Sequence, residues 1–129
     1  MKRGSAHAWS GRWEQAAQEY KLALKQSPRD SSAKTYLAMA LFKSGQLREA
    51  LDLYQELWDK LPSNLSFLQR LAEVQEAIGD LEPALTSYRL LATTYERLQQ
   101  PSEAVKGWRK AVALSPLDSD LWDALLKSA

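Results

Sequence analysis

The sequence predicts an all-α fold, an α–α solenoid of antiparallel helix–turn–helix repeats, from its period and its apolar pattern. Four columns of residues recur every 34 positions along the 129-residue chain. Within each period, apolar residues fall at steps of three and four, which places them on one face of a helix. No stretch alternates with period two, so no strand is expected. A fixed period of this length is typical of helical solenoids.

The four columns determine the local structure expected for each repeat. They contain a glycine (Gly11, Gly45 and Gly79), an alanine (Ala16, Ala50 and Ala84), a tyrosine (Tyr20, Tyr54 and Tyr88) and a proline (Pro28 and Pro62). The glycine is expected to end one helix, because it adopts the left-handed conformation without strain. The alanine lets two helix backbones approach, the tyrosine fills the space beside it, and the proline stops the second helix. N-cap candidates follow two residues after a proline, namely Asp30, Asn64 and Asp118.

The expected helices follow from these signals. In chain order they are a partial helix at Ser5–Ser10, then Arg12–Gln26, Ser31–Ser44, Leu47–Leu61, Leu65–Ile78, Leu81–Leu98, Pro101–Ser115 and Ser119–Ser128. The last of these has Asp120, Asp123 and Lys127 on the side opposite its apolar residues. That arrangement is expected of a capping helix, which gives a solenoid a polar outer face.

The segment Leu81–Leu98 is the longest expected helix, and the period breaks there. Ala104 follows Ala84 by 20 positions instead of 34, and Trp108 follows Tyr88 by the same 20. The difference is about the length of one helix, so one helix is expected to serve two hairpins, as the second helix of one and the first helix of the next. The predicted units of this single domain are about 1–30, 31–64, 65–98 and 85–118, which share the helix 81–98, with the capping helix 119–128.

Composition and charge narrow the class of function. The chain has 17 Lys and Arg against 16 Asp and Glu, a net charge of +1, whereas general nucleic-acid and membrane-surface binders usually carry a basic excess. Neither a nucleic acid nor a membrane is therefore expected as a partner. The chain has no cysteine, which excludes disulfides and Cys-based zinc sites but does not decide the compartment. It has no apolar run that could span a bilayer and no recognisable signal peptide, so a cytoplasmic location is expected.

No arrangement of residues points to catalysis, a cofactor or a metal. His7 is the only histidine, so neither a His-pair metal site nor a well-placed catalytic triad is expected. The scattered glycines form no phosphate-binding loop. The acidic run Asp118, Asp120 and Asp123 lacks the glycine that a calcium loop needs, and helix capping explains it better. We therefore expect a protein that is not an enzyme and that holds neither cofactor nor metal.

Taken together, the columns resemble those of the tetratricopeptide repeat (TPR) family. That family also has a small residue in its first helix, and this column is filled here by Gly4, Ala38, Ala72 and Ala92. The chain departs from the family pattern where Leu57 and Leu91 replace alanine, and where Glu96 replaces the proline of the third unit. The resemblance implies a right-handed superhelix whose first helices line a concave, peptide-binding groove.

The resemblance also implies which side chains face that groove. The candidate peptide-binding residues are Thr35, Tyr36, Met39, Phe42, Lys43, Gln69, Arg70 and Glu73. Met39 and Phe42 lie three positions apart and off the core stripe, as expected of apolar anchors for a peptide. The alternative is that both pack against the N-terminal segment near Trp9. The Lys/Asn clamp with which some family members hold a chaperone C-terminus is not matched, so that partner is not expected.

Other residues leave two interpretations open. Arg89 and Arg97 share one side of the long helix, which is either a solvated face or a cationic wall of the groove. Gly107 lies inside an expected helix, where close packing against the long helix or the capping helix would explain it. Trp108 and Trp122 are both expected in the core.

The predicted function is a non-catalytic scaffold for protein–protein interaction, which captures an unknown protein or peptide in its groove. The alternative is a self-associating structural or regulatory segment of a larger multidomain protein. A homo-oligomer would then form through the N-terminal partial repeat, because that repeat leaves apolar surface near Trp9 and Trp13 uncovered.

Overall fold

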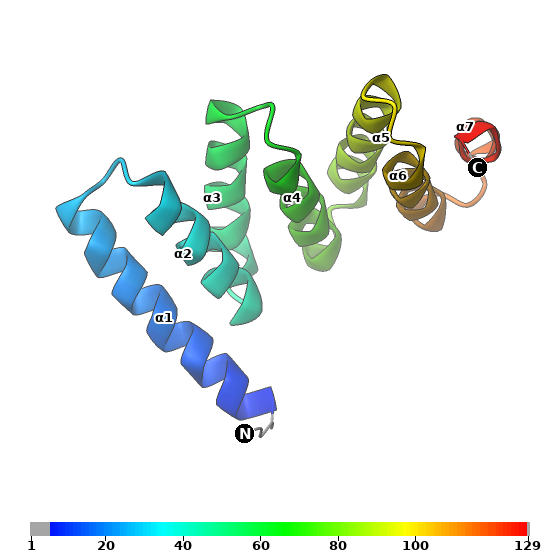
Figure 1. The fold of residues 1–129 in the computed structure, drawn as a ribbon. Helices are drawn as coiled ribbons and strands as arrows, with labels where there is room; N and C mark the ends of the chain where they lie inside the picture. Colours follow the sequence, from blue (N-terminus) through cyan, green and yellow to red (C-terminus); the bar gives the residue numbers. More distant parts are fainter. Residues whose placement is uncertain (1–5, 129) are drawn as a thin grey trace. The chain divides into compact units, whose positions relative to one another are not determined.

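The computed structural model describes the backbone of residues 6–128 and the side chains of residues 12–127 (Figure 1). The helices of this part are α1 (Ala6–Gln26), α2 (Ser31–Lys43), α3 (Leu47–Lys60), α4 (Leu65–Ile78), α5 (Leu81–Arg97), α6 (Pro101–Leu114) and α7 (Ser119–Ser128). No strand occurs among residues 6–128. The predicted all-α class is therefore confirmed, and α2 to α7 agree with the predicted helices to within one residue at each end.

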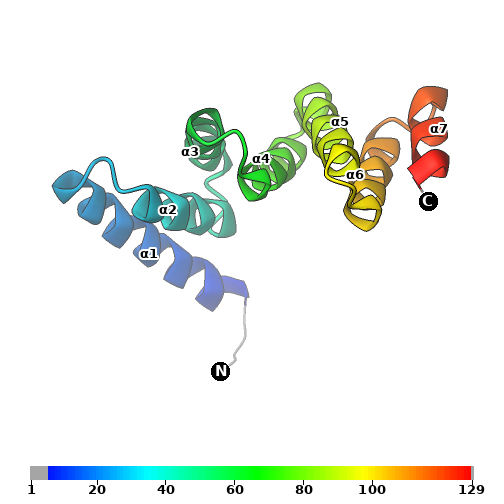
Figure 2. The same ribbon diagram turned by 45° about the horizontal axis from the view of Figure 1, so that its top comes forward.

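The first helix differs from the prediction. We expected a partial helix at Ser5–Ser10, a turn at Gly11 and a separate helix at Arg12–Gln26, but α1 runs unbroken from Ala6 through Gly11. Ser5 lies outside the described residues. A single glycine inside a helix costs only about 1 kcal/mol relative to alanine. Packing of α1 along α2 offsets a cost of that size (Figures 1 and 2). A glycine in the repeat column is therefore not sufficient to end a helix.

The helices form two compact units, each described here by itself. Unit 1 covers residues 6–67 and contains α1, α2, α3 and the start of α4. Unit 2 covers residues 68–128 and contains the rest of α4 with α5, α6 and α7. In unit 1, α2 packs on both α1 and α3, and in unit 2, α6 packs on both α5 and α7. The finer division into repeat units remains a prediction.

The alanine and aromatic columns form the core of both units. In unit 1, Ala38 and Ala50 have no exposed surface, and Tyr54 is buried beside them. In unit 2, a continuous apolar cluster consists of Ala72, Ala84, Tyr88, Ala92, Ala104, Trp108, Ala111, Val112 and Leu121. The small alanines let neighbouring helices approach, and the aromatic rings fill the remaining space.

Turns that contain proline join α1 to α2, α3 to α4 and α6 to α7. In each turn the N-cap residue (Asp30, Asn64 or Asp118) donates its backbone N–H to the carbonyl three residues earlier, at 2.9–3.2 Å. Its side-chain oxygen then accepts a backbone N–H from the first turn of the next helix, at 3.0–3.1 Å. These bonds satisfy donors that a helix N-terminus otherwise leaves without a partner. The three predicted N-caps are confirmed.

A second kind of turn ends α2, α4 and α5, and one residue in it has a left-handed backbone. Gly45 and Gly79 have φ angles of 86° and 97°, and Gln99 has a φ angle of 60°. In all three turns the next residue donates its N–H to the carbonyl five positions earlier: Gln46 to Leu41 (2.8 Å), Asp80 to Gln75 (3.0 Å) and Gln100 to Tyr95 (2.9 Å). This is the Schellman pattern, which satisfies the last carbonyls of a helix.

Helix α5 lies between two of these left-handed turns, and it has partners on both sides. Toward α4, Tyr88 Oη donates to Glu76 Oε1 at 2.8 Å. Toward α6, Glu96 Oε2 accepts from Trp108 Nε1 at 3.1 Å. In both hairpins an aromatic side chain therefore donates to the glutamate twelve residues earlier.

Close contact with α5 explains Gly107. This residue is buried in α6, and a Cβ atom added there would lie 2.9 Å from the Cβ of Ala92 and 3.2 Å from its Cα. Real Cβ atoms do not approach one another so closely, so only glycine fits at this contact. Of the two explanations that the sequence allows, packing against the long helix is confirmed.

The last helix is covered on one side only. Leu121 is buried on α6, but Trp122 is 44% exposed and Leu126 is 70% exposed. Successive residues on a helix are about 100° apart, so the stripe with Trp122 and Leu126 cannot share the side of α7 that carries Leu121. The expectation that Trp122 belongs to the core is therefore wrong, and its Nε1 donates to the Pro116 carbonyl at 2.7 Å instead. The same expectation for Trp108 is confirmed.

Replacing Gln99 by glycine should stabilise the protein by about 0.5–1 kcal/mol, because glycine adopts a positive φ without the Cβ penalty. Urea unfolding followed by circular dichroism measures the change. Gln100→Gly is the matched control, since Gln100 has an ordinary φ of −117° and should gain nothing. A Gln99→Gly protein no more stable than the wild type would contradict this account of the turn.

Gly107→Ala should destabilise the protein by about 1–3 kcal/mol, although alanine favours helix, because the new Cβ meets the backbone of α5. The same unfolding experiment measures this loss. The double variant Ala92→Gly, Gly107→Ala removes the opposing Cβ and should recover part of the stability. A stabilising Gly107→Ala substitution would show that the two helices do not meet at this point.

Candidate functional site

Five of the predicted groove residues lie along α2 in unit 1. Lys43 is exposed and Tyr36 is 51% exposed, whereas Thr35, Met39 and Phe42 are half-buried. Met39 and Phe42 therefore each keep part of their apolar surface accessible. The side chain of Trp9, the alternative cover for these two residues, lies outside the described side chains.

Two of these α2 side chains already have partners within unit 1. Thr35 Oγ1 donates to the Ser31 carbonyl at 2.8 Å, so its hydroxyl bonds to its own helix. The Tyr36 ring stacks on the Tyr20 ring of α1, with centroids 5.6 Å apart and planes at 21°. One face of Tyr36 is therefore covered by Tyr20 of α1, although about half of the residue's surface stays exposed.

The other three predicted residues form a polar group on α4 in unit 2. Arg70 Nη1 donates to Glu73 Oε1 at 3.1 Å, and Gln69 Nε2 donates to Glu73 Oε2 at 3.5 Å. The fold thus brings these three side chains together on one surface of α4. The residues of α2 belong to unit 1, so the predicted set is divided between the two units.

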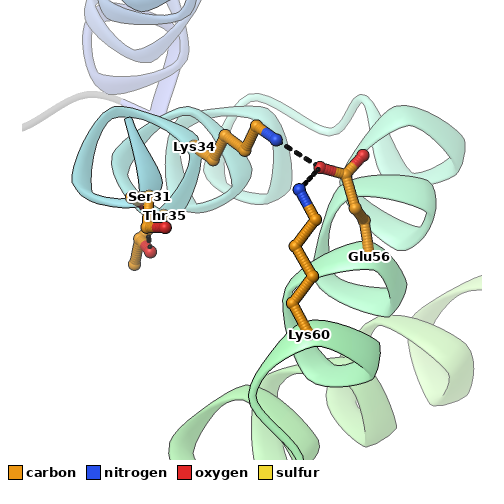
Figure 3. A network of polar contacts seen from close by, with 5 residues as sticks. All are labelled: Ser31, Lys34, Thr35, Glu56 and Lys60. Carbon is orange, nitrogen blue, oxygen red and sulfur yellow. Dashed lines mark hydrogen bonds and ion pairs between the residues drawn. The ribbon is translucent and has the colours of Figure 1, made fainter. Parts of the chain in front are cut away.

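A charged network on the other side of α2 links it to α3. Lys34 of α2 and Lys60 of α3 both point toward one oxygen of Glu56, and the Lys60 nitrogen lies 3.4 Å from it (Figure 3). The hydrogen bond from Lys34 lowers the pKa of the Glu56 carboxyl, and the same bond raises the pKa of Lys34. Glu56 and Lys34 therefore stay charged at neutral pH, and the Glu56 carboxylate is paired within unit 1.

The network borders a shallow hollow of about 260 Å³ in unit 1. Its lining residues are Lys21, Leu37, Leu41, Glu49, Asp52, Leu53 and Glu56. We call it the unit 1 hollow. Three carboxylates line this hollow, and the network already pairs that of Glu56. A second, Glu49, is also paired within unit 1, because Lys21 Nζ lies 3.2 Å from Glu49 Oε2.

Unit 2 contains a larger hollow of about 340 Å³ between α4, α5 and α6. Its lining residues are Gln69, Glu73, Tyr88, Leu91, Tyr95, Glu103, Lys106, Gly107, Arg109 and Lys110. We call it the unit 2 hollow. Tyr88, Leu91 and Tyr95 of α5 form an apolar floor, and the charged residues of α6 form most of the rim. Two predicted residues, Gln69 and Glu73, therefore line a real cavity.

A constant spacing in the sequence relates the lining residues of the two hollows. Six lining residues of the unit 1 hollow have a counterpart 54 positions later, the spacing that relates Ala38 to Ala92 and Ala50 to Ala104. These pairs are Leu37 and Leu91, Leu41 and Tyr95, Glu49 and Glu103, Asp52 and Lys106, Leu53 and Gly107, and Glu56 and Lys110. Two acidic positions thus become lysines, and a leucine side chain is replaced by glycine.

Sequence reasoning did not identify the α5 and α6 residues of this hollow. The groove was sought on first helices only, whereas most of the rim belongs to the second helix α6. A comparison of the chain with itself at a shift of 54 positions would have shown the change of charge at Lys106 and Lys110. Without the structure, nothing indicates that these positions surround a cavity.

Two buried hydrogen bonds fix α5 on α4 beside the hollow. Ser87 Oγ donates to Gln75 Oε1 at 2.7 Å, and both residues are buried. Tyr88 Oη donates to Glu76 Oε1 at 2.8 Å. Burial and this hydrogen bond both raise the pKa of the Tyr88 phenol far above its ordinary value. The floor of the unit 2 hollow is therefore held in place by hydrogen bonds between α5 and α4.

Neither a membrane span nor a metal site is found in the described part of the chain. None of its helices is both long and apolar enough to cross a bilayer. Nor do three or more of its histidine, aspartate and glutamate side chains come together in a way that could hold a metal ion.

Comparisons with known proteins give one family and a set of similar folds. The sequence profile of the family described as "Bacterial transcriptional activator domain" matches residues 1–79. The structure described as "MamA RS-1 ArsTM double mutant" is similar with a TM-score of 0.54 and 19% identity, over 92% of this chain and 74% of that chain. For "MamA MSR-1 C2" the TM-score is 0.52 at 19% identity, over 95% and 78%. Both similarities show a TPR-like helical-repeat fold. No curated protein matches the sequence.

Tyr88→Phe should make stability less sensitive to alkaline pH. The unfolded chain loses the phenolic proton near pH 10, whereas the folded protein keeps it to higher pH. The stabilisation is therefore complete below about pH 10 and is lost as the pH rises further. In urea unfolding from neutral to alkaline pH, the wild type should lose more stability than Tyr88→Phe. Tyr36→Phe, which removes an exposed phenol, is the control, and identical slopes for wild type and Tyr88→Phe would disprove the assignment.

Proposed function

The chain belongs to the bacterial transcriptional activator domain family, and from this premise we propose that it is a non-catalytic protein-interaction module of a transcriptional regulator. The observation that carries the proposal is the family match over residues 1–79. The helical-repeat fold supports it, because stacked helical hairpins present extended surfaces that suit binding to another protein. We propose that the module resembles TPR proteins in this respect.

In this proposal the partner contacts the predicted residues of α2. Met39 and Phe42 keep accessible apolar surface beside the exposed Lys43, so they combine an apolar anchor with a polar rim. The polar group of Gln69, Arg70 and Glu73 on α4 would add selectivity for the partner's charges. These assignments are supported by exposure and chemistry.

The double variant Met39→Ala, Phe42→Ala should lose the partner, because few interface residues carry most of the binding energy. Affinity capture from a lysate of the source organism with mass spectrometry identifies the partner, and titration of the purified partner then measures affinity. We expect a loss of about tenfold or more.

The matched control is Leu22→Ala, Leu90→Ala, which removes two exposed leucines outside the predicted set. This control should keep its affinity, and circular dichroism should show both variants folded. Unchanged binding by a folded Met39→Ala, Phe42→Ala protein would refute the role of α2.

Self-association is a second candidate function. Apolar side chains at the α7 end favour it, since Leu117 is 97% exposed and Leu126 is 70% exposed. The N-terminal residues through which a homo-oligomer was predicted have side chains outside the described ones. Sedimentation over a range of concentrations distinguishes the two functions, because a strict monomer would eliminate self-association.

A further inference from the structure

The two hollows differ in how their charges are neutralised. In unit 1, Glu56 is paired with Lys34 and Lys60, and Glu49 is paired with Lys21. In unit 2, Lys106 Nζ lies 3.4 Å from Glu103 Oε1. The two remaining rim cations, at positions 109 and 110, are exposed and have no hydrogen bond or ion pair within residues 12–127. The unit 2 hollow therefore keeps free positive charge.

The register of α5 explains this difference. The counterpart of Lys34, 54 positions later, is Tyr88, and the counterpart of Glu56 is Lys110. Tyr88 is the aromatic residue that packs α5 on α4, and its hydroxyl is bonded to Glu76. The ion pair of unit 1 consequently has no equivalent in unit 2, and Lys110 remains available for an external carboxylate.

The floor of the unit 2 hollow suits an apolar side chain. Tyr88 and Leu91 are buried and Tyr95 is half-buried, so they form a fixed surface of ring and aliphatic carbon. Gly107 of α6 also lines this hollow, at the position that Leu53 occupies in the unit 1 hollow. A volume of about 340 Å³ is at the small end of ligand pockets, so it fits one or two large side chains.

We propose that the unit 2 hollow binds an acidic peptide segment of a partner protein. One apolar side chain of the segment rests on Tyr88, Leu91 and Tyr95, and flanking carboxylates pair with Arg109 and Lys110. This proposal rests on the proposed function, that the chain binds a protein, and adds the chemistry of the partner. Charge complementarity selects an acidic segment, and the apolar floor provides the anchor that a purely acidic chain lacks.

A nucleic acid fits this site less well. Glu73 and Glu103 also line the hollow, and their carboxylates repel a phosphate backbone that passes over it. A duplex is too wide to enter a cavity of this size, so it would leave the apolar floor without a partner. A peptide can instead direct its carboxylates toward the α6 cations and away from Glu73.

The test uses the full chain and fluorescein-labelled synthetic peptides in fluorescence anisotropy. The probe is Glu-Asp-Glu-Phe-Leu-Glu-Asp-Glu. One comparison peptide has Ser-Ser in place of Phe-Leu, and a second has Gln and Asn in place of Glu and Asp. A labelled DNA duplex tests the nucleic-acid alternative. We expect the probe to bind more tightly than all three, with an affinity that falls as salt screens the charges.

Charge reversal locates the site. Arg109→Glu, Lys110→Glu should weaken binding of the probe by about tenfold or more, since two favourable pairs become repulsive. Arg89→Glu, Arg97→Glu is the matched control. It changes the net charge of unit 2 by the same amount as Arg109→Glu, Lys110→Glu, but at exposed residues outside the hollow. It should weaken binding less than about twofold, an effect of net charge alone. A peptide with Lys and Arg in place of Glu and Asp should in turn bind Arg109→Glu, Lys110→Glu better than wild type.

Amide NMR signals of Leu91 and Gly107 should shift when the probe is added to the wild-type protein. Four results would each overturn the proposal. These are an equal loss of affinity in the two charge-reversed variants, binding of the Ser-Ser peptide as tight as that of the probe, tighter binding of the duplex, and unshifted Leu91 and Gly107 signals. Its failure differs from failure of the proposed function. If the captured partner binds wild type and Arg109→Glu, Lys110→Glu equally, the chain binds protein at another site, whereas a chain that captures no partner lacks the proposed function itself.

Discussion

Helix α5 has to pack against α4 and α6 at once, and the arrangement of unit 2 depends on this constraint. Each end of α5 borders a left-handed turn, so the chain reverses direction twice around one helix. Small residues make both contacts possible. Ala84 of α5 has no exposed surface. On the α6 side, Ala92 of α5 lies so close to Gly107 that a Cβ atom at position 107 would not fit. The polar contacts then fix the pairing, with Tyr88 bonded to α4 and Glu96 bonded to α6.

The chemistry of the unit 2 hollow follows from the same constraint. Because Tyr88 joins α5 to α4, α5 carries an aromatic residue at the position 54 residues after Lys34 of α2. The ion pair that neutralises Glu56 in unit 1 is then impossible in unit 2, and the position of Glu56 is free to hold Lys110. The unit 1 hollow is thus acidic with two of its three carboxylates paired, whereas the unit 2 hollow has free cations and an apolar floor.

The sequence predicted those features that depend on local backbone chemistry. Left-handed glycines and N-caps act within a few residues, so Gly45, Gly79 and Asp30 were predicted correctly. Prediction failed where tertiary packing decides. Gly11 lies inside a helix because its neighbours and the packing of α1 outweigh its small intrinsic cost. Trp122 is exposed because burial depends on which helices lie nearby, and an aromatic residue in a repeat column does not determine that. The unit 2 hollow combines three helices, and no local pattern describes such a combination.

The two hollows also show how one repeat can differ from another in what it binds. In unit 1, a ligand that used Glu56 would have to displace Lys34 and Lys60, and the carboxylate is already neutralised in the free protein. In unit 2, Arg109 and Lys110 have no internal partner to displace in the described residues, so a complementary carboxylate competes only with solvent for them. Specificity is a difference between such free energies, and occupied charges disfavour a ligand as effectively as missing ones. Internal ion pairs therefore decide which of the two hollows keeps charged side chains available to a ligand.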